Sequence, residues 1–209
     1  MIEALMEDVT FRFGKTGPII IENFSLGIKK GDFVYIAGQN SSGKSTILKI
    51  LCGLISPQKG SVMILDKNPF KNPEVMKQVG VLVDGMGFYS DLSLKENIIL
   101  FAKEKYGNGG IEEALKKYIK LWDIDFNTLY KRSSHGMRKI AQLTLSLLGE
   151  PQVLIWDEPE VALDEKRYAI LIDIIKDYKS KEKTIIMAGT VPTRYETLIN
   201  KTVYKEVIL

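Results

Sequence analysis

The stretch AGQNSSGKST, residues 37–46, constrains the fold of this chain more than any other part of its sequence. Four residues separate Gly38 from the triplet Gly43-Lys44-Ser45. A glycine at position 43 lets consecutive backbone N–H groups point at phosphate oxygens, Lys44 adds a cation, and Ser45 adds a hydroxyl that can bind Mg²⁺. The pattern therefore predicts a loop that binds the phosphates of a nucleotide at the start of a helix.

Short apolar runs alternate with helical patterns along the chain, which predicts a mostly parallel α/β sheet. The predicted buried strands are Asp32–Gly38, Val79–Asp84, Val153–Pro159 and Thr184–Gly189. The predicted helices are Ser45–Ile55, Ser93–Tyr106 with a capping box at its start, Ile111–Trp122, a segment from just after Ser134 to about Leu148, and a segment of about Glu165–Lys179. The three middle helices form a predicted helical block of roughly residues 86–148 between two α/β portions.

Two acids follow one of the predicted strands. VLIWDE places Asp157 and Glu158 at the end of a run that a sheet would bury. An unpaired buried carboxylate is costly, so a cation is expected nearby. Beside a phosphate-binding loop, Asp157 would face Mg²⁺ and Glu158 would face the terminal phosphate and polarise an attacking water. Without such a loop, the same pair is equally consistent with an ordinary strand end.

Composition limits the partners and the compartment. The net charge of +3, without a long basic run, does not favour nucleic acid. The single cysteine, Cys52, excludes an internal disulfide and suits a reducing compartment, and its apolar neighbours predict a core position. The first residues lack the layout of a secretory signal, and no apolar run reaches the roughly 18 residues of a membrane span. We therefore expect a soluble chain without direct membrane insertion, whose membrane role would come through a partner.

With these motifs in order, the sequence resembles the ATP-binding cassette (ABC) ATPases over nearly its whole length. FRFG, residues 11–14, resembles the early segment whose aromatic side chain stacks on adenine, here Phe13. GQNSSGKST resembles the Walker A loop, with Ser41 where the family usually has glycine. SDLSLKENI resembles the start of the helical sub-domain, GEPQVLIWDEP the Walker B strand, and VALD, which ends at Asp164, the D-loop.

The resemblance implies a fold, a division of the chain and a set of site residues. It implies an α/β fold of the P-loop NTPase type, with an N-terminal antiparallel β portion, a mostly parallel sheet and an inserted helical sub-domain. Residues 1–209 would be one ABC ATPase domain, with 1–85 and 149–209 as the ATP-binding core and about 86–148 as the helical signature sub-domain. The candidate catalytic residues are Glu158 and Lys44, and the candidate Mg²⁺ ligands are Ser45, Asp157 and Asp84. The candidate nucleotide-binding residues are Phe13, Gly38, Gln39, Asn40, Ser41, Ser42, Gly43, Lys44, Ser45, Thr46, Ser134 and Gly136.

The family's way of working implies partners. Two cassettes sandwich the nucleotide, so the signature helix of one faces the phosphate loop of the other. The leading hypothesis is an ATP-binding subunit that binds and hydrolyses Mg-ATP to drive a separate transmembrane permease, at the cytoplasmic face of the cell membrane. The partner cassette would be a second copy or a more regular cassette in a heterodimer. Rival interpretations are a regulatory cassette that dimerises on ATP with little hydrolysis and a soluble cassette acting on ribosomes or DNA.

Besides Ser41 of the Walker A loop, three further motifs depart from the family pattern. The signature Leu-Ser-Gly-Gly-Gln aligns with residues 133–137, SSHGM, so the only histidine, His135, replaces the first glycine. Asp84 stands where the Q-loop glutamine is expected. It would either bind Mg²⁺ or water or be a plain loop carboxylate. Thr190 stands where the switch histidine is expected.

The resemblance also predicts where the lone histidine lies. At the start of the signature helix, His135 would be on the far side of the subunit from its own phosphate loop. It would then touch the nucleotide bound by a partner or remain a solvated residue of a degenerate signature.

Overall fold

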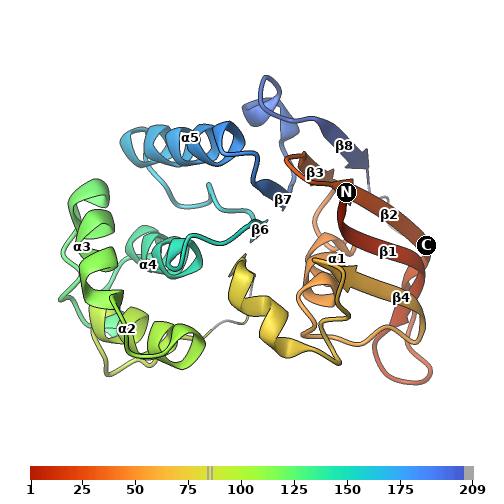
Figure 1. Cartoon of the computed structure of the whole chain (residues 1–209), viewed down its shortest axis with the longest axis horizontal. Helices are drawn as coiled ribbons and strands as arrows, with labels where there is room; N and C mark the ends of the chain where they lie inside the picture. Colours follow the sequence, from red (N-terminus) through yellow and green to blue (C-terminus); the bar gives the residue numbers. More distant parts are fainter. Residues whose placement is uncertain (84, 86, 205–209) are drawn as a thin grey trace.

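The computed structural model describes residues 1–83, 85 and 87–204. These residues form two β-sheets and five α-helices (Figure 1). The first sheet has the strand order β2-β1-β4 and the second has the order β5-β6-β7-β3-β8. The strands are β1 (Ile2–Arg12), β2 (Ile19–Lys29), β3 (Phe33–Ala37), β4 (Lys59–Ile64), β5 (Val79–Leu82), β6 (Val153–Asp157), β7 (Thr184–Gly189) and β8 (Lys201–Tyr204).

Strands β1, β2 and β3 follow one another at the start of the chain, and three α-helices follow one another between β5 and β6. These three lie together at one side of the molecule, opposite the β1, β2 and β4 sheet (Figure 1). None of the helices in the described ranges has the length and apolar character that a membrane span requires. The helices are α1 (Lys44–Leu51), α2 (Leu94–Tyr106), α3 (Ile111–Trp122), α4 (His135–Leu147) and α5 (Glu165–Ser180), with short 3-10 turns at Pro73–Gln78, Tyr130–Arg132 and Pro192–Tyr195.

The first sheet is antiparallel and contains the start of the chain. Two strands of eleven residues, β1 and β2, pair so that Leu5 faces Gly27, and β4 pairs with the other edge of β1 so that Leu5 also faces Met63. Along β2, Leu26 and Ile28 are buried while their neighbours Ser25 and Gly27 are more exposed, which is the period-two pattern of a sheet with one solvated face. The predicted N-terminal antiparallel portion is confirmed.

The second sheet is parallel in all its pairings, as the buried apolar runs predict. Every residue of β3, β6 and β7 is buried, and successive side chains point to opposite faces. Val34 and Ile36 of β3 join one core with α1 and the antiparallel sheet, whereas Phe33 and Tyr35 join a second core with α2, α3, α4 and α5. The sheet therefore lies between two hydrophobic layers.

Local signals explain where the helices begin and end. Ser93 caps α2 by accepting from the Glu96 backbone N–H at 3.1 Å, and the Glu96 carboxylate accepts from the Ser93 N–H at 2.8 Å, which is the predicted capping box. Helix α4 is tied to the sheet because the buried indole N–H of Trp156 on β6 donates to Ser146 Oγ at 3.0 Å.

Helix α1 is shorter than the predicted Ser45–Ile55. It ends at Leu51 because Gly53 adopts a φ of 71°, and the N–H of Leu54 donates to the carbonyl of Lys49 at 2.9 Å. This is a Schellman motif, in which a glycine in the left-handed region satisfies carbonyls at the end of a helix. The apolar spacing that continued to Ile55 reflects packing of the following turn rather than helix.

Candidate nucleotide-binding site

Three chain segments meet at one edge of the parallel sheet. Strand β7 pairs with both β3 and β6, and all three strands run in the same direction. The carboxyl ends of parallel strands lie at the same edge, where ligands of α/β proteins bind. The loop after β3 carries the phosphate-binding pattern, the turn after β6 carries Glu158, and the segment after β7 carries Thr190. The backbone N–H of Glu158 donates to the carbonyl of Ala188 at 2.9 Å, so the turn after β6 is bonded directly to the end of β7.

The loop after β3 has the backbone that the pattern predicts. Gly43 has a φ of 96°, a left-handed conformation that side chains disfavour, and it caps the N-terminus of α1. Lys44 is 5% exposed, and its Nζ donates to the carbonyl of Gln39 at 2.7 Å, which closes the loop over its own lysine. Ser42 is 2% exposed, and its Oγ finds no hydrogen-bond partner among the described residues. An anion at the N-terminus of α1 would supply acceptors for these groups.

The exposed part of the loop includes the residue that departs from the family pattern. Ser41 has a φ of 65°, in the region that glycine occupies at little cost. Its neighbours Gln39 and Asn40 are exposed, Gly38 and Ser45 are half-buried, and Thr46 is buried. The loop therefore keeps the glycine-like backbone at position 41 although the residue there is serine.

The two acids differ in environment. Asp157 is the last residue of β6 and is 6% exposed, whereas Glu158 is half-buried. Glu158 has a φ of 45°, a left-handed conformation that is incompatible with a continuing strand. The predicted strand Val153–Pro159 therefore ends two residues early.

One cavity of about 420 Å³ brings the loop and the acids together. Its walls come from the phosphate loop, from the turn after β6 and from the first two turns of α4. The residues that line it are Asn40, Ser41, Lys44, Ser45, His135, Lys139, Asp157, Glu158 and Val161. A basic lysine, a hydroxyl and two carboxylates around one cavity fit a polyphosphate with Mg²⁺, since this ion prefers oxygen ligands and keeps waters and phosphate oxygens for most of its sites.

The presence of His135 in this cavity corrects one prediction. His135 was predicted to lie on the far side of the subunit from its own phosphate loop, and this is wrong, because it lines the same cavity as Lys44. Helix α4 begins at His135 and packs beside β5, next to β6, so its first turns project to the edge where β6 ends. Sequence reasoning also missed Lys139, whose only signal was its i+4 spacing from His135 on one helix face.

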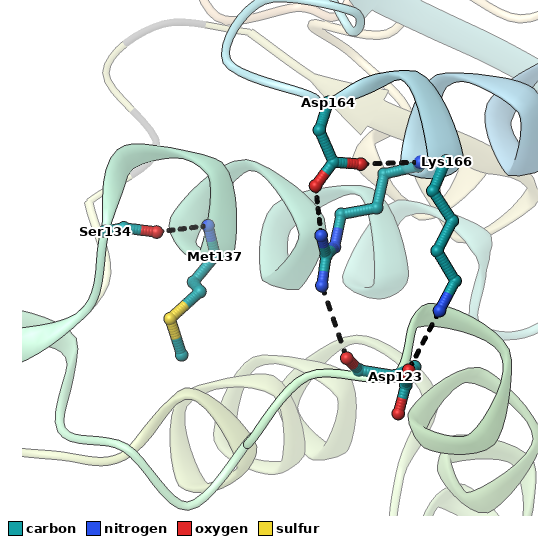
Figure 2. Close-up of polar contacts among 6 residues, drawn as sticks. Asp123, Ser134, Met137, Asp164 and Lys166 are labelled. Carbon is teal, nitrogen blue, oxygen red and sulfur yellow. Dashed lines mark hydrogen bonds and ion pairs between the residues drawn. The ribbon is translucent and has the colours of Figure 1, made fainter.

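The two predicted signature residues lie away from this cavity, on a second one. Ser134 caps α4, with its Oγ accepting from the Met137 backbone N–H at 3.2 Å (Figure 2). A Cβ atom at Gly136 would lie 2.6 Å from the carbonyl oxygen of Ala162, so only glycine fits where α4 meets the loop after β6. The second cavity, of about 730 Å³, is lined by Asp123, Ile124, Asp125, Ser134, His135, Gly136, Met137, Ile140, Ala162, Asp164 and Arg167.

Ionic contacts hold the D-loop end of this second cavity. Asp164 caps α5, and the backbone N–H of Arg167 that it accepts lowers the pKa of its carboxyl group. Lys166 forms an ion pair with Asp123 at 3.0 Å (Figure 2), and Arg167 Nη2 donates to the Asp123 carbonyl at 3.3 Å. The start of α5 is thereby tied to the end of α3.

The predicted site residues that remain are Phe13, Thr190 and Asp84. Phe13 is 59% exposed, and its ring meets Phe11 edge to face at 5.0 Å, so one face is available for stacking. It does not line the 420 Å³ cavity. Thr190 is exposed. Asp84, the candidate Q-loop replacement and Mg²⁺ ligand, lies outside the described residues.

Comparison with known proteins decides the family. A family model for the ABC transporter matches residues 21–161, which is more than half of the chain. The chain belongs to the ABC transporter family. The bacitracin transport ATP-binding protein BcrA of Bacillus licheniformis is 30% identical over 199 residues, which cover 92% of this chain and 63% of BcrA. The ABC transporter ATP-binding protein NatA of Bacillus subtilis is 28% identical over 207 residues, which cover 95% of this chain and 83% of NatA.

Solved ABC structures have the same fold. The ATP-binding subunit of an ABC transporter superposes with a TM-score of 0.86 at 23% identity, over 98% of this chain and 88% of that one. A dimeric ATP-binding cassette in a post-hydrolysis state with ADP and Pi superposes with a TM-score of 0.84 at 21% identity, over 99% of this chain and 97% of that one. The predicted P-loop NTPase fold of the ABC ATPase type is confirmed, and the chain is an ABC ATP-binding cassette.

Proposed function

We propose that this ABC cassette binds and hydrolyses Mg-ATP to drive a separate transmembrane permease. The observation that carries the proposal is the 420 Å³ cavity, which is lined both by Lys44 and Ser45 of the phosphate loop and by Asp157 and Glu158. ATP hydrolysis needs these parts, namely cations and N–H groups for the phosphates, an acid for the metal and an acid for the water.

Each residue of the cavity has a role in this proposal. Lys44 binds the β- and γ-phosphates, while Ser45 and Asp157 hold Mg²⁺, and Asp84 is proposed as a further ligand. When bound, Mg²⁺ neutralises charge on the phosphate oxygens. Glu158 accepts a hydrogen bond from the attacking water and orients it toward the γ-phosphorus. The backbone of residues 38–46 receives the phosphates, and Phe13 stacks on the adenine.

Hydrolysis is proposed to occur in a dimer. Ser134 and Gly136 lie at the exposed N-terminus of α4, outside the 420 Å³ cavity. A helix N-terminus binds anions, so these residues would meet the nucleotide held by a second cassette, either a copy of this chain or a more regular one. Within each chain, residues 1–85 and 149–209 would form the ATP-binding core and about 86–148 the helical sub-domain.

The permease is proposed to bind an apolar groove of about 720 Å³. Cys52, Gly53, Pro69 and Met76 line it, together with Leu54, which is 59% exposed. Helix α1 begins at the phosphate loop and ends at this groove, so one rigid element connects the two sites. In lysates of native cells, the wild type should sediment with the membranes, bound at their cytoplasmic face. The Leu54→Asp variant should instead stay in the soluble fraction. Co-sedimentation of the variant would contradict this assignment.

A second function is a cassette that dimerises on ATP with little hydrolysis. The observation in its favour is that the segment after β7 offers Thr190, an exposed side chain without charge, where a cation would stabilise the transition state. Turnover of the purified protein beside Glu158→Gln separates the two functions. Turnover at least tenfold above the variant is expected for the ATPase. Equal turnover, with ATP-dependent dimers in both, would establish the second function.

A further inference from the structure

Lys139 is a buried cation that the proposed hydrolysis scheme does not use. It lies on α4, one turn after His135, and it is 8% exposed. It lines the cavity that contains Lys44, Asp157 and Glu158. Within residues 1–83, 85 and 87–204, no hydrogen bond or ion pair involves its ammonium group. Lysine is rarely buried without a partner, because removing an ammonium from water is costly.

Two acids in the same cavity do not account for Lys139. Neither Asp157 nor Glu158 lies within 4.0 Å of its ammonium nitrogen as an ion pair, although all three side chains line one space of about 420 Å³. Lys44, the other lysine of the cavity, donates to the Gln39 carbonyl inside its own loop. A cavity lined by two lysines and two serines, with two carboxylates that can hold Mg²⁺, has the chemistry of a site for a polyphosphate and its metal ion.

The position of Lys139 specifies which part of a nucleotide it would meet. The N-terminus of α1 and Lys44 would receive the phosphates at the loop, and Lys139 of α4 lines the same cavity as the two acids at the end of β6. A phosphate chain that starts on the loop and extends into this cavity would bring its terminal group within reach of α4. We propose that Lys139 binds the terminal phosphate of the nucleotide held by its own subunit. It thereby distinguishes a nucleoside triphosphate from a diphosphate.

This inference rests on the proposed ATP binding and adds a cation to it. Thr190, the first residue after β7, carries no charge at this edge of the sheet. Lys139 would supply a charge from α4 instead. A lysine acts as a point charge on a flexible stem, so it can follow the terminal phosphate without the fixed geometry of an imidazole.

The test measures the affinities for ATP and ADP by calorimetry in EDTA, so that neither hydrolysis nor Mg²⁺ contributes. Lys139→Met should lower the affinity for ATP by about tenfold to a hundredfold, which corresponds to the loss of a hydrogen bond to a charged group. The affinity for ADP should stay within about twofold of the wild-type value. Lys139→Arg should keep the preference for ATP. Lys120→Met, which removes an exposed lysine on α3, is the matched control and should change neither affinity.

Two further variants make the result decisive. Lys139→Gln replaces Lys139→Met if circular dichroism shows that the methionine variant is unfolded. Lys44→Ala should lower the affinity for both ATP and ADP, because this lysine also binds the β-phosphate in the proposed scheme. Equal losses of ATP and ADP in the Lys139 variants, or no loss in either, would overturn the inference alone. A wild type that binds neither nucleotide would overturn the proposed function and the inference together.

Discussion

The phenol of Tyr195 donates a hydrogen bond to Glu160 Oε2 at 2.9 Å. Tyr195 is 1% exposed, and burial, followed by the charge of Glu160, raises the pKa of its phenol, so it remains a proton donor at physiological pH. Glu160 lies two residues after Glu158, and Tyr195 lies five residues after Thr190. One bond therefore joins the segment that would orient the water to the segment that follows β7.

Tyr195→Phe tests the energetic value of this bond. The variant leaves a half-buried carboxylate oxygen without its donor, so the free energy of unfolding should fall by about 1 to 3 kcal/mol in urea titrations. Turnover should fall more than ATP affinity, because Glu158 loses its fixed position. Tyr168→Phe is the matched control, since it removes an exposed hydrogen bond to the Arg194 carbonyl. It should lower the free energy of unfolding by less than Tyr195→Phe does. Equal costs in the two variants would contradict the prediction.

Gly136→Ala tests the contact between α4 and the loop after β6. The added Cβ would lie 2.6 Å from the Ala162 carbonyl oxygen, so one of the two segments must move. We expect a loss of about 1 to 3 kcal/mol in the free energy of unfolding, together with weaker ATP-dependent dimerisation measured by light scattering. Gly109→Ala provides the control, because a Cβ there has nothing within 4 Å. Unchanged stability of the Gly136 variant would show that the contact is relaxed in solution.

Lys105 makes the stability of the fold depend on pH. Burial lowers its pKa to about 8, against about 10.4 in an unfolded chain. Between these values the unfolded chain holds a proton that the folded chain lacks, so stability is expected to rise with pH above 8. Burial raises the pKa of Cys52, so above about pH 9 the unfolded thiol loses a proton that the folded one keeps, and this effect has the opposite sign.

The measurement is the free energy of unfolding from urea titrations between pH 7 and 9.5. The wild type should gain at most about 1 kcal/mol from pH 8 to 9 and then level off or decline. Lys105→Met should lose the rise, and Cys52→Ala should extend it beyond pH 9. A rise that persists in Lys105→Met would assign the pH dependence to another group.

Ser146→Ala tests the connection between α4 and the sheet. Ser146 Oγ accepts the buried indole N–H of Trp156 at 3.0 Å and donates to the Leu143 carbonyl at 2.7 Å. The variant leaves the indole N–H without its acceptor, which should lower the free energy of unfolding by about 1 to 3 kcal/mol. Ser180→Ala, which removes an exposed serine that also bonds a carbonyl of its own helix, should cost less and serves as the control. A cost no larger than that of the control would mean that water replaces the serine.

Local patterns predicted the elements that local forces form. The capping box at Ser93, the glycine at position 43 and the buried apolar runs of β3, β6 and β7 each gave the correct element, because each depends on nearby residues or on burial alone. The end of α1 was missed because the Schellman motif at Gly53 overrides an apolar spacing that continues beyond it. Strand β8 was also missed, since it has only four residues and owes its structure to pairing with β3.

The sequence by itself determined the phosphate loop, the acid pair and their common edge of the sheet, because motif spacing and parallel pairing fix those positions through the backbone. Only the tertiary structure decided what lies opposite them. The packing of α4 beside β5 and the close approach of Gly136 to Ala162 bring His135 and Lys139 to the cavity of Lys44. A helix has the same sequence pattern whichever way it packs, so the second lysine of the phosphate-loop cavity could be recognised only once the packing was known.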